Sequence, residues 1–361
     1  MIRVERIERI EDFERVRTEY EKVYARDPHR TVFVSWPWLR SYLTTMPQRW
    51  MLLAARADGA YVGFLVVVGY GVEAGPLKIY RELGLGAYPS ADYTGLVASS
   101  DDPAIVDAFA AAIESMPWDV LRARSVRDPR VRALVVRLGE GKSLTREEAT
   151  PCHVVALPSS WDEYLSNHRN GKQALRYALR RRNAWAEASF TDADASTIER
   201  DVEALLMLHN VRWKSNLPKA RRTYGRLFRE AHARGCCRVG VLWSEEKKPL
   251  AAQAAFIDPE RRSWGIYMLA YDKSTAKHSP GIGMLMRGIE RAISERFEEY
   301  DFLRGDEAYK ARFGSDIRWL ENFTIRRRSR RVQFAESVWT HALHAKRVVR
   351  SFIVGRVRAS A

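Results

Sequence analysis

The chain has 361 residues, of which 46% are hydrophobic and 29% are charged, which excludes a disordered protein and leaves room for two domains. The formal net charge of +15 indicates an anionic partner, such as a nucleotide cofactor, a nucleic acid or a membrane surface. Three cysteines are too few for a disulfide framework or a metal site, so we expect no metal and a reducing cytoplasm. We also expect no secretion signal and no membrane span, because the N-terminus is charged and the longest apolar run, 60–70, is short.

Residues 1–150 are predicted to form a first α/β unit. Asp58-Gly59 predicts a hairpin between two apolar runs, because this dipeptide favours the tight turns that join antiparallel strands. The expected strands are 50–56, 60–70, 77–83, 93–98 and 119–123, and the expected helices are 11–24, a helix opened by Ser35, 102–115 and 128–138. The aromatic residues Trp36, Trp38 and Tyr42 are assigned to core or interdomain packing in preference to substrate stacking.

The segment 139–160 is rich in turn-forming and polar residues, so it is predicted to be irregular and to hold the domain boundary. A second unit, 151–330, is expected to follow. Its helices are predicted at 161–183, 196–214 and 220–234, and its strands at 184–190, 236–243, 249–257, 263–270 and 318–327. The first of these helices carries a basic stripe that includes Arg169 and Arg176, either as a solvated face or as a contact for an anion.

A glycine-bearing helix start follows the third consecutive strand of the second unit. In Ser279-Pro-Gly-Ile-Gly283, Ser279 suits the N-cap and the glycines leave the backbone amides open to an anion at the positive end of the helix dipole. A plain helix start is the alternative interpretation.

The densest group of functional side chains is in 300–314. A short strand ends at Arg304-Gly305, and a short helix with Asp306 as its N-cap is expected to place Asp306 and Lys310 on one face and Tyr309 on another. Open α/β sheets bind ligands at the carboxyl ends of strands, so chemistry is expected here. A capped surface helix with one ion pair is the alternative.

The last part of the chain, 331–361, is predicted to be a basic amphipathic helix. Its apolar side chains alternate with Arg and Lys, as in an interfacial helix, although packing on the second unit is the simpler expectation.

Several sequence segments together resemble one family. The segments are Leu165-Ser-Asn-His-Arg169, His209-Asn-Val-Arg-Trp213, Pro249-Leu-Ala-Ala-Gln253, Ser279-Pro-Gly281, and Asp301-Phe-Leu-Arg-Gly-Asp306 with Tyr309-Lys310. They are similar to the CelD-like acyltransferases of the GNAT superfamily, which are associated with cell-envelope polysaccharide synthesis and resemble the Fem aminoacyltransferases. The resemblance covers most of 150–325 and is thinner over the first unit.

The resemblance implies two tandem GNAT-like lobes, the first degenerate, with mixed central sheets flanked by helices. It implies an N-acyltransferase that moves an acyl group from acyl-CoA, most simply acetyl-CoA, to an amine of an amino sugar, an amino acid or an envelope-related metabolite. The residues assigned to this reaction are Lys310, Asp306 and Tyr309 for catalysis, Ser279, Gly281, Gly283 and Gln253 for the cofactor, and Arg304, Arg169, Arg176 and Trp213 for the substrate.

Two alternatives stay open at this point. The basic stripe and tail favour a Fem-type enzyme with an aminoacyl-tRNA donor, and the tail also fits a non-catalytic scaffold that contacts an anionic membrane. No DNA partner is expected.

Overall fold

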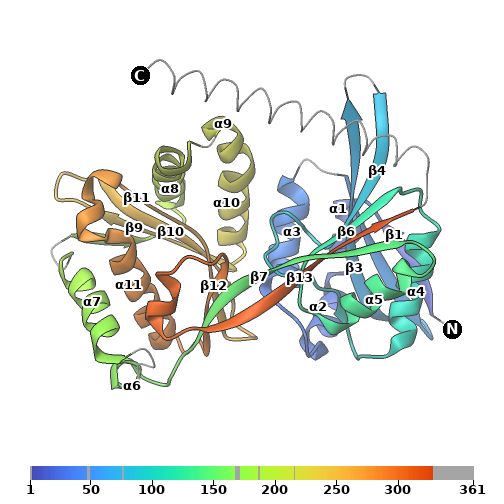
Figure 1. Cartoon of the computed structure of the whole chain (residues 1–361), viewed down its shortest axis with the longest axis horizontal. Coiled ribbons are helices and arrows are strands. Elements are labelled where there is room, and N and C mark those ends of the chain that lie inside the picture. The colour runs from blue at the N-terminus through green and yellow to red at the C-terminus, as the bar shows by residue number, and fades with distance from the viewer. Residues whose placement is uncertain are drawn as a thin grey trace, which may run out of the picture.

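The computed structural model describes residues 2–46, 49–74, 77–166, 171–185, 188–214 and 216–327. Within them, a mixed sheet of thirteen strands runs through both halves of the chain, with helices on its faces (Figure 1). The expected mixed α/β architecture is therefore confirmed. Arg169 and the predicted helix of 331–361 lie outside the described residues. None of the described helices is long and apolar enough to cross a membrane.

The N-terminal lobe, as the term is used below, comprises the elements up to α5. They are β1 (Arg3–Ile7), α1 (Ile10–Arg15), α2 (Arg17–Arg26), the 3-10 turn η1 (Val32–Val34), α3 (Trp36–Thr45), β2 (Arg49–Ala57), β3 (Ala60–Ala74), β4 (Leu77–Leu85), β5 (Val97–Ala98), α4 (Pro103–Glu114), β6 (Val120–Val126) and α5 (Pro129–Gly139). The predicted hairpin is confirmed, because β2 pairs with β3 up to Ala57 and Ala60.

The C-terminal lobe comprises α6 (Trp161–Ser166), α7 (Gly171–Asn183), β8 (Ser189–Asp192), α8 (Ile198–Trp213), α9 (Leu217–Ala220), the π turn η2 (Arg221–Gly225), α10 (Arg226–Ala233), β9 (Cys237–Trp243), β10 (Pro249–Asp258), β11 (Ser263–Tyr271), the 3-10 turn η3 (Lys273–His278), α11 (Pro280–Ser294), β12 (Glu299–Arg304) and the 3-10 turn η4 (Lys310–Phe313). The strand predicted at 184–190 begins only at Ser189.

Two long strands, β7 (Ser143–Ala156) and β13 (Asp316–Arg326), join the lobes. They pair with each other along their length, and Figure 1 shows them side by side between the two halves. In the sheet, β13 lies between β6 and β7, whereas β7 lies between β13 and β12. Each lobe thus contains part of a strand from the other half of the sequence.

The prediction of an irregular segment at 139–160 is wrong, because most of it forms β7. Its first six residues, Ser143–Glu148, are all exposed, so this part of the strand lacks the alternation of apolar and polar residues that indicates a half-buried strand. The expected division at residue 150 lies inside β7, where Thr150 pairs with Leu320.

A hydrophobic core fills the region where the helices of the two lobes meet. Trp38 on α3 is fully buried and packs edge-on against Phe256 of β10, with ring centroids 5.8 Å apart. Phe33 makes a similar contact with Phe256 at 6.0 Å. The assignment of Trp38 to interdomain packing is confirmed. This shared core fixes one lobe against the other.

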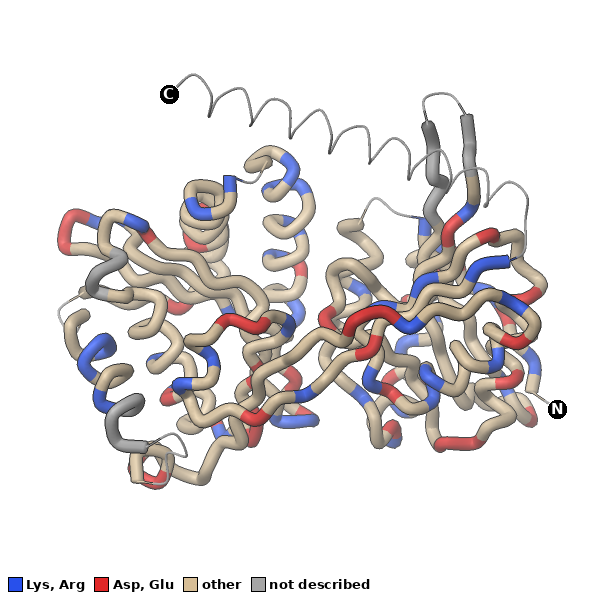
Figure 2. The backbone as a smooth tube through the Cα atoms, viewed as in Figure 1, with Lys and Arg blue, Asp and Glu red and all other residues tan. Residues whose placement is uncertain are grey.

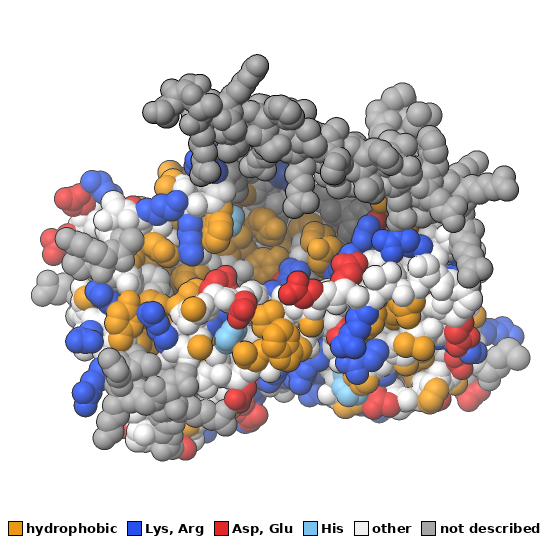
Figure 3. Space-filling view, in the orientation of Figure 1, with side chains coloured by type: hydrophobic (Ala, Val, Ile, Leu, Met, Phe, Trp, Pro, Cys, Tyr) orange, Lys and Arg blue, Asp and Glu red, His pale blue; other side chains and the backbone are white. Residues whose placement is uncertain are grey.

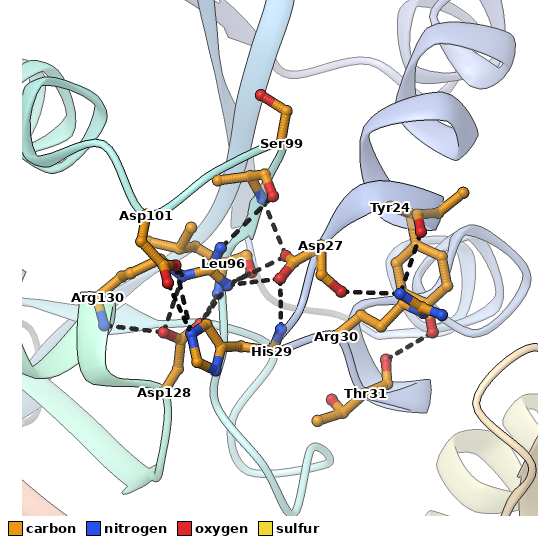
Figure 4. A network of polar contacts seen from close by, with 12 residues as sticks. Tyr24, Asp27, His29, Arg30, Thr31, Leu96, Ser99, Asp101, Asp128 and Arg130 are labelled. Atoms are coloured by element: carbon orange, nitrogen blue, oxygen red, sulfur yellow. Dashed lines mark hydrogen bonds and ion pairs between the residues drawn. The ribbon is translucent and has the colours of Figure 1, made fainter.

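A buried ionic network supports the N-terminal lobe beside the segment 86–101 (Figure 4). Arg130, at the start of α5, contacts Asp27 at 2.9 Å and Asp128 at 2.8 Å, and both carboxylates are almost fully buried. Asp27 also accepts a hydrogen bond from the Ala98 amide, and Arg130 donates to the Leu96 carbonyl. The network therefore anchors the end of the segment that leads from β4 to β5.

Candidate functional site

The site begins at a pair of parallel strands that separate. β11 and β12 pair only from Ser263–Glu299 to Gly265–Asp301, and beyond that point both strands line an open cleft of about 820 Å³. Figure 3 shows the hollow between the two halves, with hydrophobic side chains in its floor. In the N-terminal lobe the corresponding parallel pair, β4 and β6, is followed by a further bridge between Thr94 and Val126. The open separation belongs to the C-terminal lobe.

The end of β12 turns sharply into the cleft. Leu303 has a φ of 55° and Gly305 a φ of 129°, both in the region that favours glycine. The Lys310 ammonium donates to the three consecutive carbonyls of this turn, at 3.3 Å to Leu303, 3.0 Å to Arg304 and 3.2 Å to Gly305. Its side chain is 3% exposed, so it acts as a buried clamp on the turn.

The carboxylate partner of Lys310 is Glu307, at 2.9 Å, and not Asp306 as predicted. The short helix expected from Asp306 is a 3-10 turn that starts only at Lys310. Asp306 therefore precedes the turn, and the two side chains do not share one face of a helix. The Asp306 side chain is 82% exposed, is not part of the cleft lining, and has His153 at 3.7 Å. Lys310, Tyr309 and Glu307 line the cleft.

Arg304 is held by the N-terminal lobe. Its Nε donates to Asp92 at 2.6 Å, its backbone amide donates to the other Asp92 oxygen at 3.3 Å, and a further guanidinium nitrogen donates to the Pro89 carbonyl at 3.2 Å. Asp92 is 6% exposed. Neither Asp92 nor Tyr88, which both line the cleft, was among the site residues predicted from the sequence.

The C-terminal end of α8 forms another wall. Trp213, predicted to bind substrate, lines the cleft and is 58% exposed. Its neighbours His209 and Arg212 also line the cleft and were not among the predicted site residues. Burial and the Arg212 charge lower the pKa of His209, so its imidazole is neutral near pH 7. Burial raises the pKa of Tyr309 to about 12, which keeps its hydroxyl protonated.

The predicted cofactor loop opens α11 as expected, and its part in cofactor binding stays a prediction. Ser279 has a φ of 49° and makes no side-chain cap; its hydroxyl lies 3.2 Å from that of Tyr177 on α7. A Cβ on Gly283 would lie 3.0 Å from the Arg181 carbonyl oxygen, so Gly283 permits close packing of α7 on α11. A Cβ on Gly281 would meet the Tyr271 ring at 3.1 Å.

Gln253 and Arg176 lie away from the cleft lining. Gln253 is 4% exposed on β10 and faces α11, where a Cβ on Gly288 would lie 3.1 Å from its Nε2. Its Oε1 has no hydrogen-bond partner among the described residues. Arg176 is exposed on α7, where Figure 2 shows several basic residues along the helix. The structure therefore brings Arg304, Tyr309, Lys310 and Trp213 together, and leaves the other predicted residues at a distance from them.

Comparison with known proteins places this site in a known domain. Residues 169–311 match the family described as "Acetyltransferase (GNAT) domain". This part of the chain is therefore similar to GNAT acetyltransferase domains. The GNAT match runs from the start of α7 through Lys310 and includes the separating strands, so the chain is an acyltransferase. No curated protein matches the sequence.

Solved structures share the whole fold, including the second lobe. FemX matches with a TM-score of 0.60 at 10% identity, over 88% of this chain and 96% of that one. A tandem GNAT protein from the clavulanic acid biosynthesis pathway matches with a TM-score of 0.54 at 13% identity, over 90% and 99%. L-PGS from Bacillus licheniformis matches with a TM-score of 0.55 at 11% identity, over 88% and 94%. The expected GNAT fold is confirmed, and the CelD-like assignment stays a prediction.

Proposed function

We propose that the chain is an acyl-CoA-dependent N-acyltransferase that acts on an amine of an amino sugar, an amino acid or an envelope-related metabolite. The observation that supports this best is the separation of β11 from β12 inside the GNAT domain. The gap opens into the cleft on one side, while α11, which starts shortly after β11, presents its N-terminus beside Tyr271. A donor phosphate at that N-terminus would meet the positive end of the helix dipole.

The proposed reaction is direct attack of the amine on the acyl carbonyl. Backbone amides of β11 around Met268, which lines the cleft, are assigned to the oxyanion, because preorganised N–H donors stabilise charge that develops in the transition state. The amine proton passes to the neutral imidazole of His209, and Tyr309 gives its proton to the sulfur when the carbon–sulfur bond breaks. Lys310 holds the turn that carries Arg304, and we assign Asp306 no step.

Isothermal titration with acetyl-CoA and CoA tests the donor. The variant Ser279→Asp places a carboxylate at the start of α11, and Asp tolerates the left-handed backbone found there. We expect saturable binding by the native chain, a loss of at least about tenfold in Ser279→Asp, and near-native binding in the neutral control Ser279→Asn. The absence of binding to both compounds would overturn the proposed donor.

A second candidate, transfer from an aminoacyl-tRNA, is favoured by the basic surface of α7. Arg176 and Arg180 are exposed on this helix, whereas Arg182 pairs with Glu290 at 2.7 Å. Binding of total bacterial tRNA, measured between about 50 and 200 mM salt, tests it, because each neutralised phosphate adds to the salt dependence. The native chain and the double variant Arg176→Gln, Arg180→Gln are compared. Equal binding by both, or none, would remove this candidate.

A further inference from the structure

The basic residues of the cleft differ in how they are neutralised. Arg304 pairs with Asp92, Arg124 with Glu147, and Lys310 with Glu307. Within each of these three pairs the positive and the negative charge cancel. Arg212 is different: it has no carboxylate partner among the described residues. The described lining of the cleft therefore offers one uncompensated positive charge, at the C-terminal end of α8.

The Arg212 guanidinium is also held in a fixed orientation. Its carbon lies 4.9 Å from the centre of the Trp213 ring and 4.6 Å from that of Tyr271. Aromatic rings at these distances attract the guanidinium electrostatically, and its N–H groups can still donate hydrogen bonds. The acceptor found for it among the described residues is the Leu269 carbonyl oxygen, at 3.4 Å. The other four of the five N–H donors that a guanidinium carries have no acceptor within the part of the chain that the structure describes.

We propose that Arg212 forms an acceptor subsite that binds a single anionic group, and that the acceptor is therefore a primary amine carrying one carboxylate or one phosphate. A planar guanidinium binds both groups with two parallel hydrogen bonds, which a neutral cleft wall cannot supply. The identification of the bound molecule as the acceptor rests on the proposed function. The existence of an anion subsite is inferred from the contacts and the charge of Arg212 alone.

The same chemistry has a second possible source, the phosphates of the donor. Tyr271, which contacts Arg212, also lies against the start of α11 at Gly281. The acceptor is favoured because Arg212 lines the cleft together with Trp213 and Tyr224, whereas Ser279 and Gly281 do not line it. The experiment below separates the two sources.

Two matched pairs of amines serve as probes: D-glucosamine 6-phosphate with D-glucosamine, and glycylglycine with glycylglycinamide. Isothermal titration measures the affinity of each for the native chain, with and without saturating CoA. We expect the anionic member of at least one pair to bind about 10- to 100-fold more tightly, as a bidentate ionic hydrogen bond contributes. Arg212→Gln should abolish this preference. Arg212→Lys should retain part of it, because lysine keeps the positive charge but cannot donate the two parallel hydrogen bonds of a guanidinium.

The control is Arg226→Gln, which removes one charge from an exposed residue at the start of α10, outside the cleft lining. It should leave the preference unchanged, and circular dichroism checks that all variants fold. Equal affinity within both pairs, no binding by any probe, or a preference that survives Arg212→Gln would overturn the inference. A loss of CoA affinity in Arg212→Gln with an unchanged amine preference would assign Arg212 to the donor phosphates and also overturn it.

The failure of the proposed function would look different. If the native chain bound neither acetyl-CoA nor CoA, the proposed donor would be wrong, yet the anion preference measured without CoA would still report on Arg212. If CoA bound and the amine pairs showed no preference, the donor site would stand and the acceptor subsite would fall.

Discussion

Asp92 and Arg304 are 212 residues apart in the chain and meet at the wall of the cleft, where the carboxylate of one lobe binds both the guanidinium and the backbone amide of the other. Arg304 follows directly on the left-handed residue Leu303, and its carbonyl is bound by Lys310. The pair therefore fixes the turn at the end of β12 from the side of the N-terminal lobe. This lobe therefore helps to shape the candidate site.

We expect Asp92→Asn to lower kcat/KM for the acceptor amine by about 10- to 100-fold, because a displaced Arg304 disturbs the geometry of the reacting groups. The free energy of unfolding should fall by about 1 to 3 kcal/mol, since the side chain of Arg304 is 29% exposed and water replaces part of the lost pair. Steady-state kinetics and urea unfolding measure the two effects, and the affinity for CoA should stay the same.

Asp119→Asn is the matched control for this prediction. Asp119 likewise accepts from the backbone amide of an arginine, Arg81, at 2.9 Å and pairs with its guanidinium at 3.5 Å, but it does not line the cleft. It should lose some stability and keep its kcat/KM. Equal kinetic losses in both variants would show that Asp92 acts only through the stability of the lobe.

Lys310→Met is expected to lower the free energy of unfolding by about 3 kcal/mol or more, because it leaves the carbonyls of Leu303, Arg304 and Gly305 without their donor. Glu307→Gln should cost less than about 1 kcal/mol, since Glu307 is 49% exposed. Urea unfolding of both variants tests this. A Lys310→Met protein of native stability that has lost turnover would place the ammonium in the chemistry instead of the turn.

Much of the architecture followed from the sequence. Where apolar residues recur with a clear period and turn residues bound the segment, as in the hairpin of β2 and β3, the prediction agrees with the structure. β7 was missed because its exposed half, Ser143–Glu148, is paired with β13, which lies far along the chain. A strand stabilised by a distant partner needs no local apolar alternation.

The candidate site was predicted only in part, for a related reason. The segment around Lys310 was recognised because its functional residues are adjacent in sequence. Asp92 was not, because its role depends on a contact with Arg304 across the lobes. Arg212 was not among the predicted site residues, since its joint contact with the Trp213 and Tyr271 rings exists only in the folded chain.

Gly283 and Gly281 should respond differently to alanine. At Gly283 the new methyl group would lie 3.0 Å from the Arg181 carbonyl oxygen and 3.2 Å from the Trp185 ring, so α7 must shift, at a cost of about 1 to 3 kcal/mol. At Gly281 it would lie 3.1 Å from the Tyr271 ring, which can rotate, and 3.6 Å from Leu269, which is an ordinary contact. Because alanine also favours the helix, the change should stay within about 1 kcal/mol. Thermal unfolding and CoA titration of both variants test whether glycine is needed at position 283 for helix packing or for cofactor contact. A Gly283→Ala protein with native stability and no CoA binding would contradict the packing role.

Asp301 gives the protein a pH dependence that can be isolated. Burial raises the pKa of its carboxyl to about 6, although Tyr93 donates a hydrogen bond to it at 2.5 Å. The unfolded chain ionises this group near pH 4, so between about pH 4 and 6 the native state holds the extra proton, and the contribution of Asp301 to stability falls as the pH rises. Well above pH 6 the ionised carboxylate costs about 3 kcal/mol.

Asp301→Asn removes this cost while keeping an oxygen acceptor for the Leu303 amide, which donates to Asp301 at 2.7 Å. The melting temperature of the variant minus that of the native chain should therefore be about 2 to 4 °C more favourable at pH 7.5 than at pH 4.5. Melting curves that stay parallel across this range would show that Asp301 is already ionised in the native state at low pH.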